Sequence, residues 1–234
     1  MSEIILMNDP RVAGIPVHES HEPLVDLREL PFLRVDTRLA DPAGAYALLR
    51  EGVVWRLARA ARLLPEGLCL LVTEGYRPLA PQQRYLDRYE AEPRACHPDR
   101  PESCARTESC ACTESYARTE SYPRTRTSRS LSPPEMGPHV AGAAVDLTLC
   151  TADGVELDLG TPVNASPEES EGACRTAAPN ITATARRNRR TLSAALTTAG
   201  LTNYPAQWWH WSYGDRYWAL ATGAATARYG PANA

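Results

Sequence analysis

The apolar side chains of residues 41–64 recur at steps of three and four, which places them on one face of an α-helix. Asp41 and Pro42 suit the cap and first turn, and Pro65 follows the last apolar position, so we expect one helix over 41–64. The same spacing predicts helices from about Pro81 to Glu92 and from about Thr182 to Thr198, the last one ended by Gly200.

Two uninterrupted apolar runs indicate strands. Residues 68–73 are apolar on both sides and bounded by glycine, which is typical of a buried strand. Residues 143–149 form a second strand, with 155–159 as its expected hairpin partner. Residues 1–40 are rich in Pro and Asp with short apolar runs, so we expect an extended arm or edge strands packed on the body.

A six-residue near-repeat occupies residues 104–129, where CARTES, CACTES and YARTES follow one another. This period fits neither helix nor strand, and the segment has almost no aliphatic side chain to bury. A β-solenoid is the alternative, but it would have nothing to stack. We therefore expect a long irregular, low-complexity insertion over about 96–132.

These elements predict an α+β fold in a single domain spanning 1–234. Its core would be a small, mostly antiparallel sheet flanked by helices. A chain of 234 residues with 43% hydrophobic residues can bury one such core but hardly two.

Composition narrows the function classes. The net charge of -3 gives no basic field, which argues against nucleic acid as a partner. No run of about 18 apolar residues is present and the start lacks a signal peptide's apolar region, so we expect a cytoplasmic protein that does not span a membrane. Seven Cys is an odd number, and Cys110 and Cys112 lack the spacing of a structural zinc site. Neither charge nor composition indicates the oligomeric state.

His139 and Asp146 are candidate ligands of one metal ion. A straight strand would hold them about 23 Å apart, so the chain must bend between them, and Gly142 is the residue that can bend it. His210 would complete a three-ligand site with a position left for water. Gln207 lies three residues earlier and would reach the same ion only through a turn or bulge. A packing cluster without metal is the alternative for all three ligands.

Arginines offer two further candidates. Arg77 follows the buried strand and is suited to hold an oxyanion or carboxylate, although an ion pair with Glu74 is the simpler interpretation. Arg186, Arg187, Arg189 and Arg190 are most simply a solvated or ion-paired helix face.

Five motifs in series resemble the D-alanyl-D-alanine dipeptidases associated with vancomycin resistance and related bacterial metallopeptidases. They lie between Glu74 and Trp218 and read EGYRP, HVAGAAVDLTL, LGTPVN, ARRNRR and WWHWSYGDRYW. The resemblance implies one zinc ion (Zn²⁺) per chain on His139, Asp146 and His210. It also implies a dipeptide substrate whose tetrahedral intermediate Arg77 stabilises.

Three positions depart from that family's pattern. The family's general base, a Glu three residues before the last His, is Gln207 here, and an amide cannot accept a proton near neutral pH. The Ser two residues before the first His is Gly137, and the acidic residue that holds the substrate's amino group aligns with Asn164. The resemblance therefore implies an impaired dipeptidase, or a catalytically inactive, metal-containing peptide-binding protein, acting on D-alanyl-D-alanine or a related dipeptide.

Overall fold

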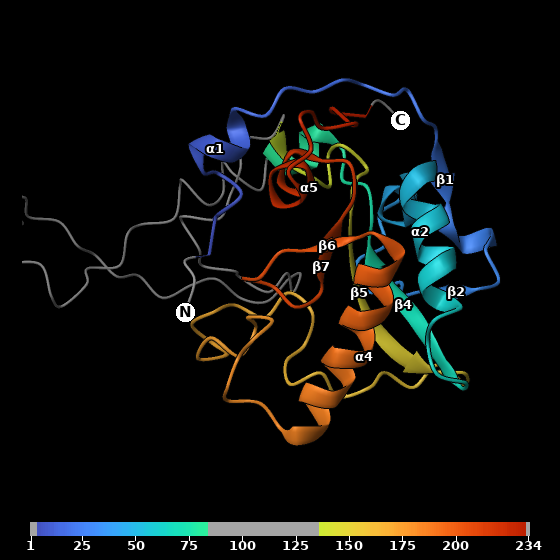
Figure 1. The fold of residues 1–234 in the computed structure, drawn as a ribbon. Helices are drawn as coiled ribbons and strands as arrows, with labels where there is room; N and C mark the ends of the chain where they lie inside the picture. The colour runs from blue at the N-terminus through green and yellow to red at the C-terminus, as the bar shows by residue number, and fades with distance from the viewer. Residues whose placement is uncertain (1–3, 84–135, 233–234) are drawn as a thin grey trace, which may run out of the picture.

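A computed structural model of the chain describes residues 4–83 and 136–232 (Figure 1). Residues 79–83 are helical, whereas the rest of the helix expected up to Glu92 lies outside the described residues. The hexad near-repeat and the insertion expected over 96–132 also lie outside them.

A five-stranded sheet forms the centre of the fold, and its strand order is β2-β4-β5-β7-β6. The edge strand β2 runs parallel to β4, and every other neighbouring pair is antiparallel, which confirms the α+β class with a mostly antiparallel sheet. β4 and β5 confirm the two predicted buried strands. The strands are β2 (Leu33–Val35), β4 (Leu68–Glu74), β5 (Ala144–Thr151), β6 (Thr202–Asn203) and β7 (His210–Ser212).

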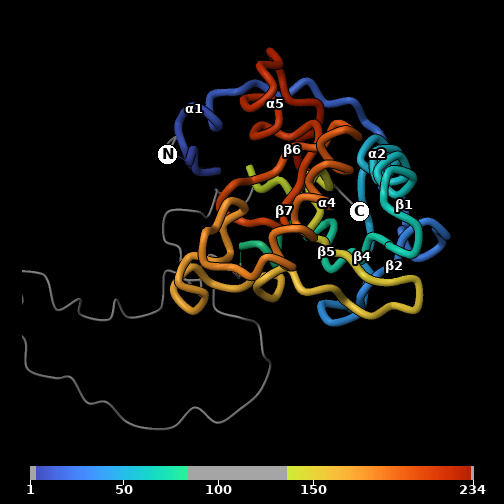
Figure 2. The backbone as a smooth tube through the Cα atoms, turned by 60° about the horizontal axis from the view of Figure 1, so that its bottom comes forward, coloured from blue at the N-terminus to red at the C-terminus, as the bar shows by residue number. Residues whose placement is uncertain are grey.

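Two helices, α2 (Glu51–Ala61) and α4 (Ala183–Ala199), lie side by side and share one core with the sheet (Figure 2). Their buried leucines meet the apolar side chains of β4 and β5, and burial of such a side chain stabilises the fold by about 1.5–3 kcal/mol. The main members of this core are Leu57, Leu70, Leu147, Leu149, Leu192 and Leu196. Among the described residues, no helix is both long and apolar enough to cross a bilayer.

The predicted helix over 41–64 is wrong in its first half. A 3-10 turn occupies Ala45–Ala47, and β3 (Leu48–Arg50) pairs with β1 (Leu24–Asp26) as a separate two-stranded sheet. Pairing with β1 satisfies the backbone groups that a helix would have bonded internally. The apolar residues at 45–49 are buried or half-buried here, as they would be on the inner face of a helix, so their spacing could not distinguish the two arrangements.

The predicted C-terminal helix is confirmed, because α4 begins after Thr182 and ends at Gly200. The Thr182 hydroxyl accepts a hydrogen bond from the Ala185 amide at 2.9 Å, and Gly200 takes the left-handed conformation with φ 93°. Cap and stop signals therefore fixed both ends.

The expected strand over 155–159 is reduced to an isolated bridge between Cys150 and Glu156. Beyond it, Asp158 binds the Gly160 amide at 2.7 Å and the Thr182 hydroxyl at 3.1 Å. These bonds turn the chain toward α4 instead of along β5.

The N-terminal part combines edge strands with short helices. β1 and β2 come from this part, together with α1 (Pro10–Ala13) and a 3-10 turn at Leu27–Glu29. The sequence pattern did not predict α1. A last helix, α5 (Arg216–Thr222), follows β7.

Candidate metal centre

Three polar residues lie in one row across the sheet. Glu74 at the end of β4 is opposite Asp146 near the start of β5, and Asp146 is opposite His210 at the start of β7. Directly opposite residues on antiparallel strands have Cβ atoms about 5 Å apart. The strand register thus brings together side chains that are far apart in the sequence.

His139 reaches the same place from a tight turn before β5. The Gly142 amide donates to the His139 carbonyl at 3.0 Å, and Gly142 has φ 64°, so the chain bends at the residue expected to bend it. A Cβ atom at Gly142 would lie 2.5 Å from Leu24 Cδ2, so a larger residue would also require the Leu24 side chain to move.

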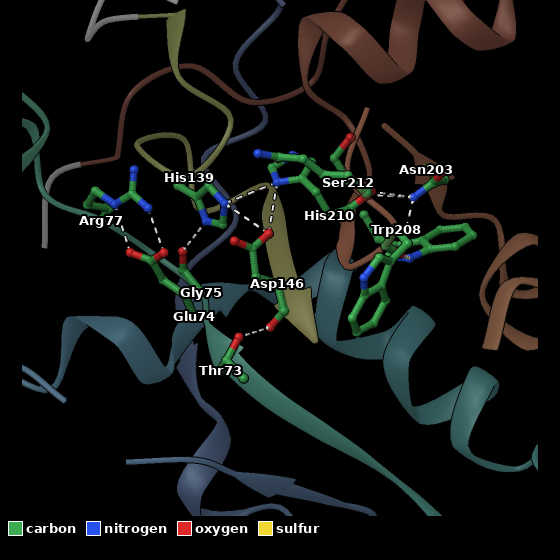
Figure 3. Close-up of polar contacts among 12 residues, drawn as sticks. Thr73, Glu74, Gly75, Arg77, His139, Asp146, Asn203, Trp208, His210 and Ser212 are labelled. Atoms are coloured by element: carbon green, nitrogen blue, oxygen red, sulfur yellow. Dashed lines mark hydrogen bonds and ion pairs between the residues drawn. The ribbon is translucent and has the colours of Figure 1, made fainter. Parts of the chain in front are cut away.

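The donor atoms of His139, Asp146 and His210 converge (Figure 3). His139 Nε2 lies 3.2 Å from His210 Nδ1, and Asp146 Oδ1 lies 2.9 Å from that Nδ1 and 3.4 Å from the Nε2. Zinc bonds of about 2.0–2.2 Å at tetrahedral angles place donor atoms roughly 3.3–3.5 Å apart. The donor set and its spacing therefore fit a metal ion such as zinc.

The orientation of the His139 ring also fits a metal ligand. Its Nδ1 lies 2.7 Å from the Gly75 carbonyl oxygen, which leaves Nε2 to face Asp146 and His210. Ligating histidines usually bond a carbonyl or carboxylate through their second nitrogen in this way. No sequence motif marked the contribution of Gly75, because it comes from a backbone atom.

Burial and neighbouring charges shift the pKa values of this cluster in opposite directions. His139, Asp146 and His210 are all buried. Burial alone would raise the pKa of Asp146, but the adjacent imidazoles of His139 and His210 lower it below its usual value. Burial alone would lower the pKa of His139, but the Asp146 carboxylate raises it. The site therefore holds an ionised carboxylate in the interior, which is costly without a cation to pair with.

Arg77 lies beside the triad and is ion-paired with Glu74, as the simpler interpretation expected. Its Nε and Nη2 donate to the two carboxylate oxygens of Glu74 at 2.7 and 2.5 Å, and its Nη1 donates to Gln82 Oε1 at 2.8 Å. The Arg77 amide also donates to the His139 carbonyl at 3.2 Å. The Arg77 segment and the His139 turn are therefore joined directly.

Gln207 occupies a turn that leads into His210. Its amide donates to the Tyr204 carbonyl at 2.9 Å, and its carbonyl accepts from the His210 amide at 3.3 Å and from Asn203 Nδ2 at 3.1 Å. The turn that residues 207 and 210 need in order to face one ion is therefore present. The Gln207 side chain is half-buried and makes no hydrogen bond within the described residues.

Asn203 is a site residue that sequence analysis missed. Its Nδ2 also donates to the His210 carbonyl at 3.0 Å, so one amide group ties both ends of the turn. No motif or spacing marked this position.

Asn164, the position aligned with the family's acidic residue, is not linked to the triad by hydrogen bonds within the described residues. It lies in a turn with φ 66°, a conformation that Asn adopts more readily than most residues. No hydrogen bond among the described residues joins Asn164 to His139, Asp146 or His210.

The interpretation of Arg189 as part of a solvated face is wrong. Its side chain is buried, and its guanidinium donates to the carbonyls of Leu159, Ala173 and Arg175 at 2.7–2.8 Å. It also lies 5.3 Å from the centre of the Trp208 ring. Arg186, Arg187 and Arg190 are exposed, as expected. The spacing of Ala185, Arg189, Leu192 and Leu196 along one helix face is the sequence signal that could have identified this exception.

Comparisons with known proteins show sequence similarity to one family of peptidases. A family profile described as D-ala-D-ala dipeptidase (Peptidase_M15) matches residues 34–224. A D-alanyl-D-alanine dipeptidase of Synechocystis sp. is 29% identical over 240 residues, covering 88% of this chain and 87% of that protein. A D-alanyl-D-alanine dipeptidase of Escherichia coli is 35% identical over 72 residues, covering 31% of this chain and 35% of that protein.

Proposed function

Because the chain belongs to the D-ala-D-ala dipeptidase family of metallopeptidases, we propose that it is a zinc-dependent dipeptidase for D-alanyl-D-alanine or a related dipeptide, with hydrolysis slowed by Gln207. The proposal rests on the convergence of the His139, Asp146 and His210 donor atoms within 3.4 Å of one another. Two neutral imidazoles and a carboxylate form a typical ligand set of catalytic zinc.

The three buried side chains would hold the ion, and Gly75 would fix the ring orientation of His139. A bound zinc ion would polarise the scissile carbonyl and lower the pKa of a water molecule. Arg77 would stabilise the negative charge that develops on the carbonyl oxygen. Glu74 holds its guanidinium by two hydrogen bonds, so its orientation is set before a substrate binds.

Hydrolysis needs a group that takes a proton from water and returns it to the leaving nitrogen as the C–N bond breaks. A carboxylate at position 207 would serve, whereas the Gln207 amide cannot accept the proton near neutral pH. General base catalysis contributes roughly 10²- to 10⁴-fold. We therefore expect this chain to bind its dipeptide while hydrolysing it that much more slowly than a chain with Glu at this position.

The test compares the purified protein with Gln207→Glu and Gln207→Ala. We expect zinc in near-equal molar ratio to all three, and a rise in kcat on D-alanyl-D-alanine of roughly 10²- to 10⁴-fold in Gln207→Glu alone. L-alanyl-L-alanine serves as the stereochemical control. Absence of bound zinc from all three proteins would reject the proposal.

Gln207 itself favours a second candidate, a peptide-binding protein that keeps the metal site without catalysis. Calorimetry tests the dipeptide binding that both functions require, and the turnover of Gln207→Glu separates them, because only the dipeptidase gains turnover in this variant. Tight binding with no gain in turnover would establish the second candidate.

A further inference from the structure

A segment near the N-terminus pairs with the C-terminal segment, and both are linked to the turn that carries His139. The His18 amide donates to the Ala227 carbonyl at 2.8 Å, and the Ser20 amide donates to the Arg228 carbonyl at 2.9 Å. We call residues 16–23 and 227–232 together the clasp. Both segments lie outside residues 34–224, the part matched by the family profile.

Glu22 holds the two segments of the clasp together and anchors them to α2. Its Oε2 accepts from the Tyr229 hydroxyl at 2.5 Å and from the Gly52 amide at 2.8 Å, and its Oε1 accepts from Arg228 at 3.1 Å. Hydrogen bonds to an ionised group are among the stronger ones in proteins. The clasp is therefore fixed to the body of the fold.

Arg50 connects the clasp to the turn that carries His139. Its side chain is 6% exposed, and its Nη1 and Nη2 donate to the Glu22 and Gly230 carbonyls at 2.6 and 3.3 Å. Its Nε donates to the Ala141 carbonyl at 2.9 Å. One guanidinium thus binds both segments of the clasp and the metal turn.

The end of the clasp makes a second connection. The Ala232 amide donates to the Val140 carbonyl at 2.9 Å, and the Tyr76 hydroxyl donates to the Ala232 carbonyl at 2.9 Å. Val140 follows His139 and Tyr76 precedes Arg77. A single residue of the clasp therefore touches the segments of both candidate functional residues.

The three backbone carbonyls that follow His139 all accept hydrogen bonds from residues outside the turn. Ala232 binds that of Val140, the Arg50 side chain binds that of Ala141, and the Arg50 amide binds that of Gly142 at 2.9 Å. Such bonds fix the backbone from which the His139 ring projects.

We propose that Arg50 is a positioning residue which, with the clasp, sets the His139 turn and thereby the metal affinity of the site. The inference rests on the proposed function only in assigning a metal to the triad. Loss of these bonds would leave buried carbonyls unpaired and let the turn move away from Asp146 and His210.

Two variants test this proposal. Arg50→Lys keeps the charge, but an ammonium group cannot reproduce a fork that reaches three carbonyls. A chain ending at Tyr229 removes the contacts of Gly230 and Ala232 while leaving Arg50 in place. Leu57→Ala is the control, because it removes a buried side chain of α2 that forms none of the hydrogen bonds to the turn, and it should lower stability alone.

The measurements are zinc affinity by chelator competition and the visible spectrum of the cobalt-substituted proteins, both taken well below the melting temperatures. We expect Arg50→Lys and the shortened chain to bind zinc roughly tenfold more weakly, because removing groups that orient a metal ligand has an effect of this size. Both should also have altered cobalt spectra. Leu57→Ala should keep the parent affinity and spectrum. Parent-like affinity in both clasp variants, with a lowered melting temperature only, would overturn the proposal.

Amide hydrogen exchange in the metal-free proteins separates this inference from the proposed function. The amides of residues 141–144 bond within the turn. We expect them to exchange at least about tenfold faster in both clasp variants than in Leu57→Ala, whether or not the parent binds zinc. Equal exchange rates in these variants and in Leu57→Ala would reject the positioning role of Arg50 and the clasp. A parent protein that binds no metal would instead reject the proposed dipeptidase function.

Discussion

Replacing Arg189 by Ala should remove a large part of the stability of this fold. Burial lowers the pKa of Arg189 to about 10, so its guanidinium stays charged at neutral pH. The carbonyls of Leu159, Ala173 and Arg175 would each lose a charged donor. An unpaired buried acceptor costs about 1–3 kcal/mol, and partial relaxation reduces the sum, so we expect a loss of about 4 kcal/mol. The free energy of unfolding of a typical domain is about 5–15 kcal/mol, so Arg189→Ala should be close to unfolding.

Urea denaturation of metal-free protein at 25 °C measures this loss without the stabilising effect of bound metal. Arg190→Ala is the matched control, because Arg190 is exposed on the same helix and its loss should change stability by no more than about 0.5 kcal/mol. Arg189→Lys should fall between the two, since it keeps the charge but not the fork. A loss under about 1 kcal/mol in Arg189→Ala would show that the three carbonyls do not depend on this residue.

Two further substitutions test other parts of the structure. Gly142→Ala should lower the free energy of unfolding by about 2 kcal/mol and weaken zinc binding, because φ is positive and the new Cβ would clash with Leu24. Urea denaturation measures the first effect and chelator competition the second. Unchanged stability and zinc affinity would contradict the close approach. Burial alone would raise the pKa of Glu22, but hydrogen bonds from the Tyr229 hydroxyl and the Gly52 amide lower it below 4.5. The carboxylate therefore contributes stability above pH 4.5 that is lost as the pH falls. Glu22→Gln should lower the free energy of unfolding by about 1–2 kcal/mol at pH 7, and this loss should shrink below pH 4.5. A loss that does not depend on pH would refute this assignment.

Local chemistry in the sequence was sufficient for much of the fold. The ends of α4 followed from Thr182 and Gly200, because cap and stop residues act on backbone groups within a few positions. The buried strands β4 and β5 followed from apolar runs bounded by glycine. The bend at Gly142 followed from the conformational freedom of that residue.

The candidate ligands His139, Asp146 and His210 were identifiable from residue type and motif order, whereas their convergence was decided by strand register. Asp146 faces His210 only because β5 and β7 pair in one alignment, and a shift by one residue would turn the carboxylate to the other face. The false helix over 41–50 has the same origin, since β3 exists only through its partner β1. Arg189 was expected on a solvated or ion-paired helix face, and nothing in the sequence singled out Arg50. The carbonyls that these two residues bind come from segments distant in the chain. Local preferences reach only a few residues along the backbone, so which distant groups bury one another was decided by the tertiary structure.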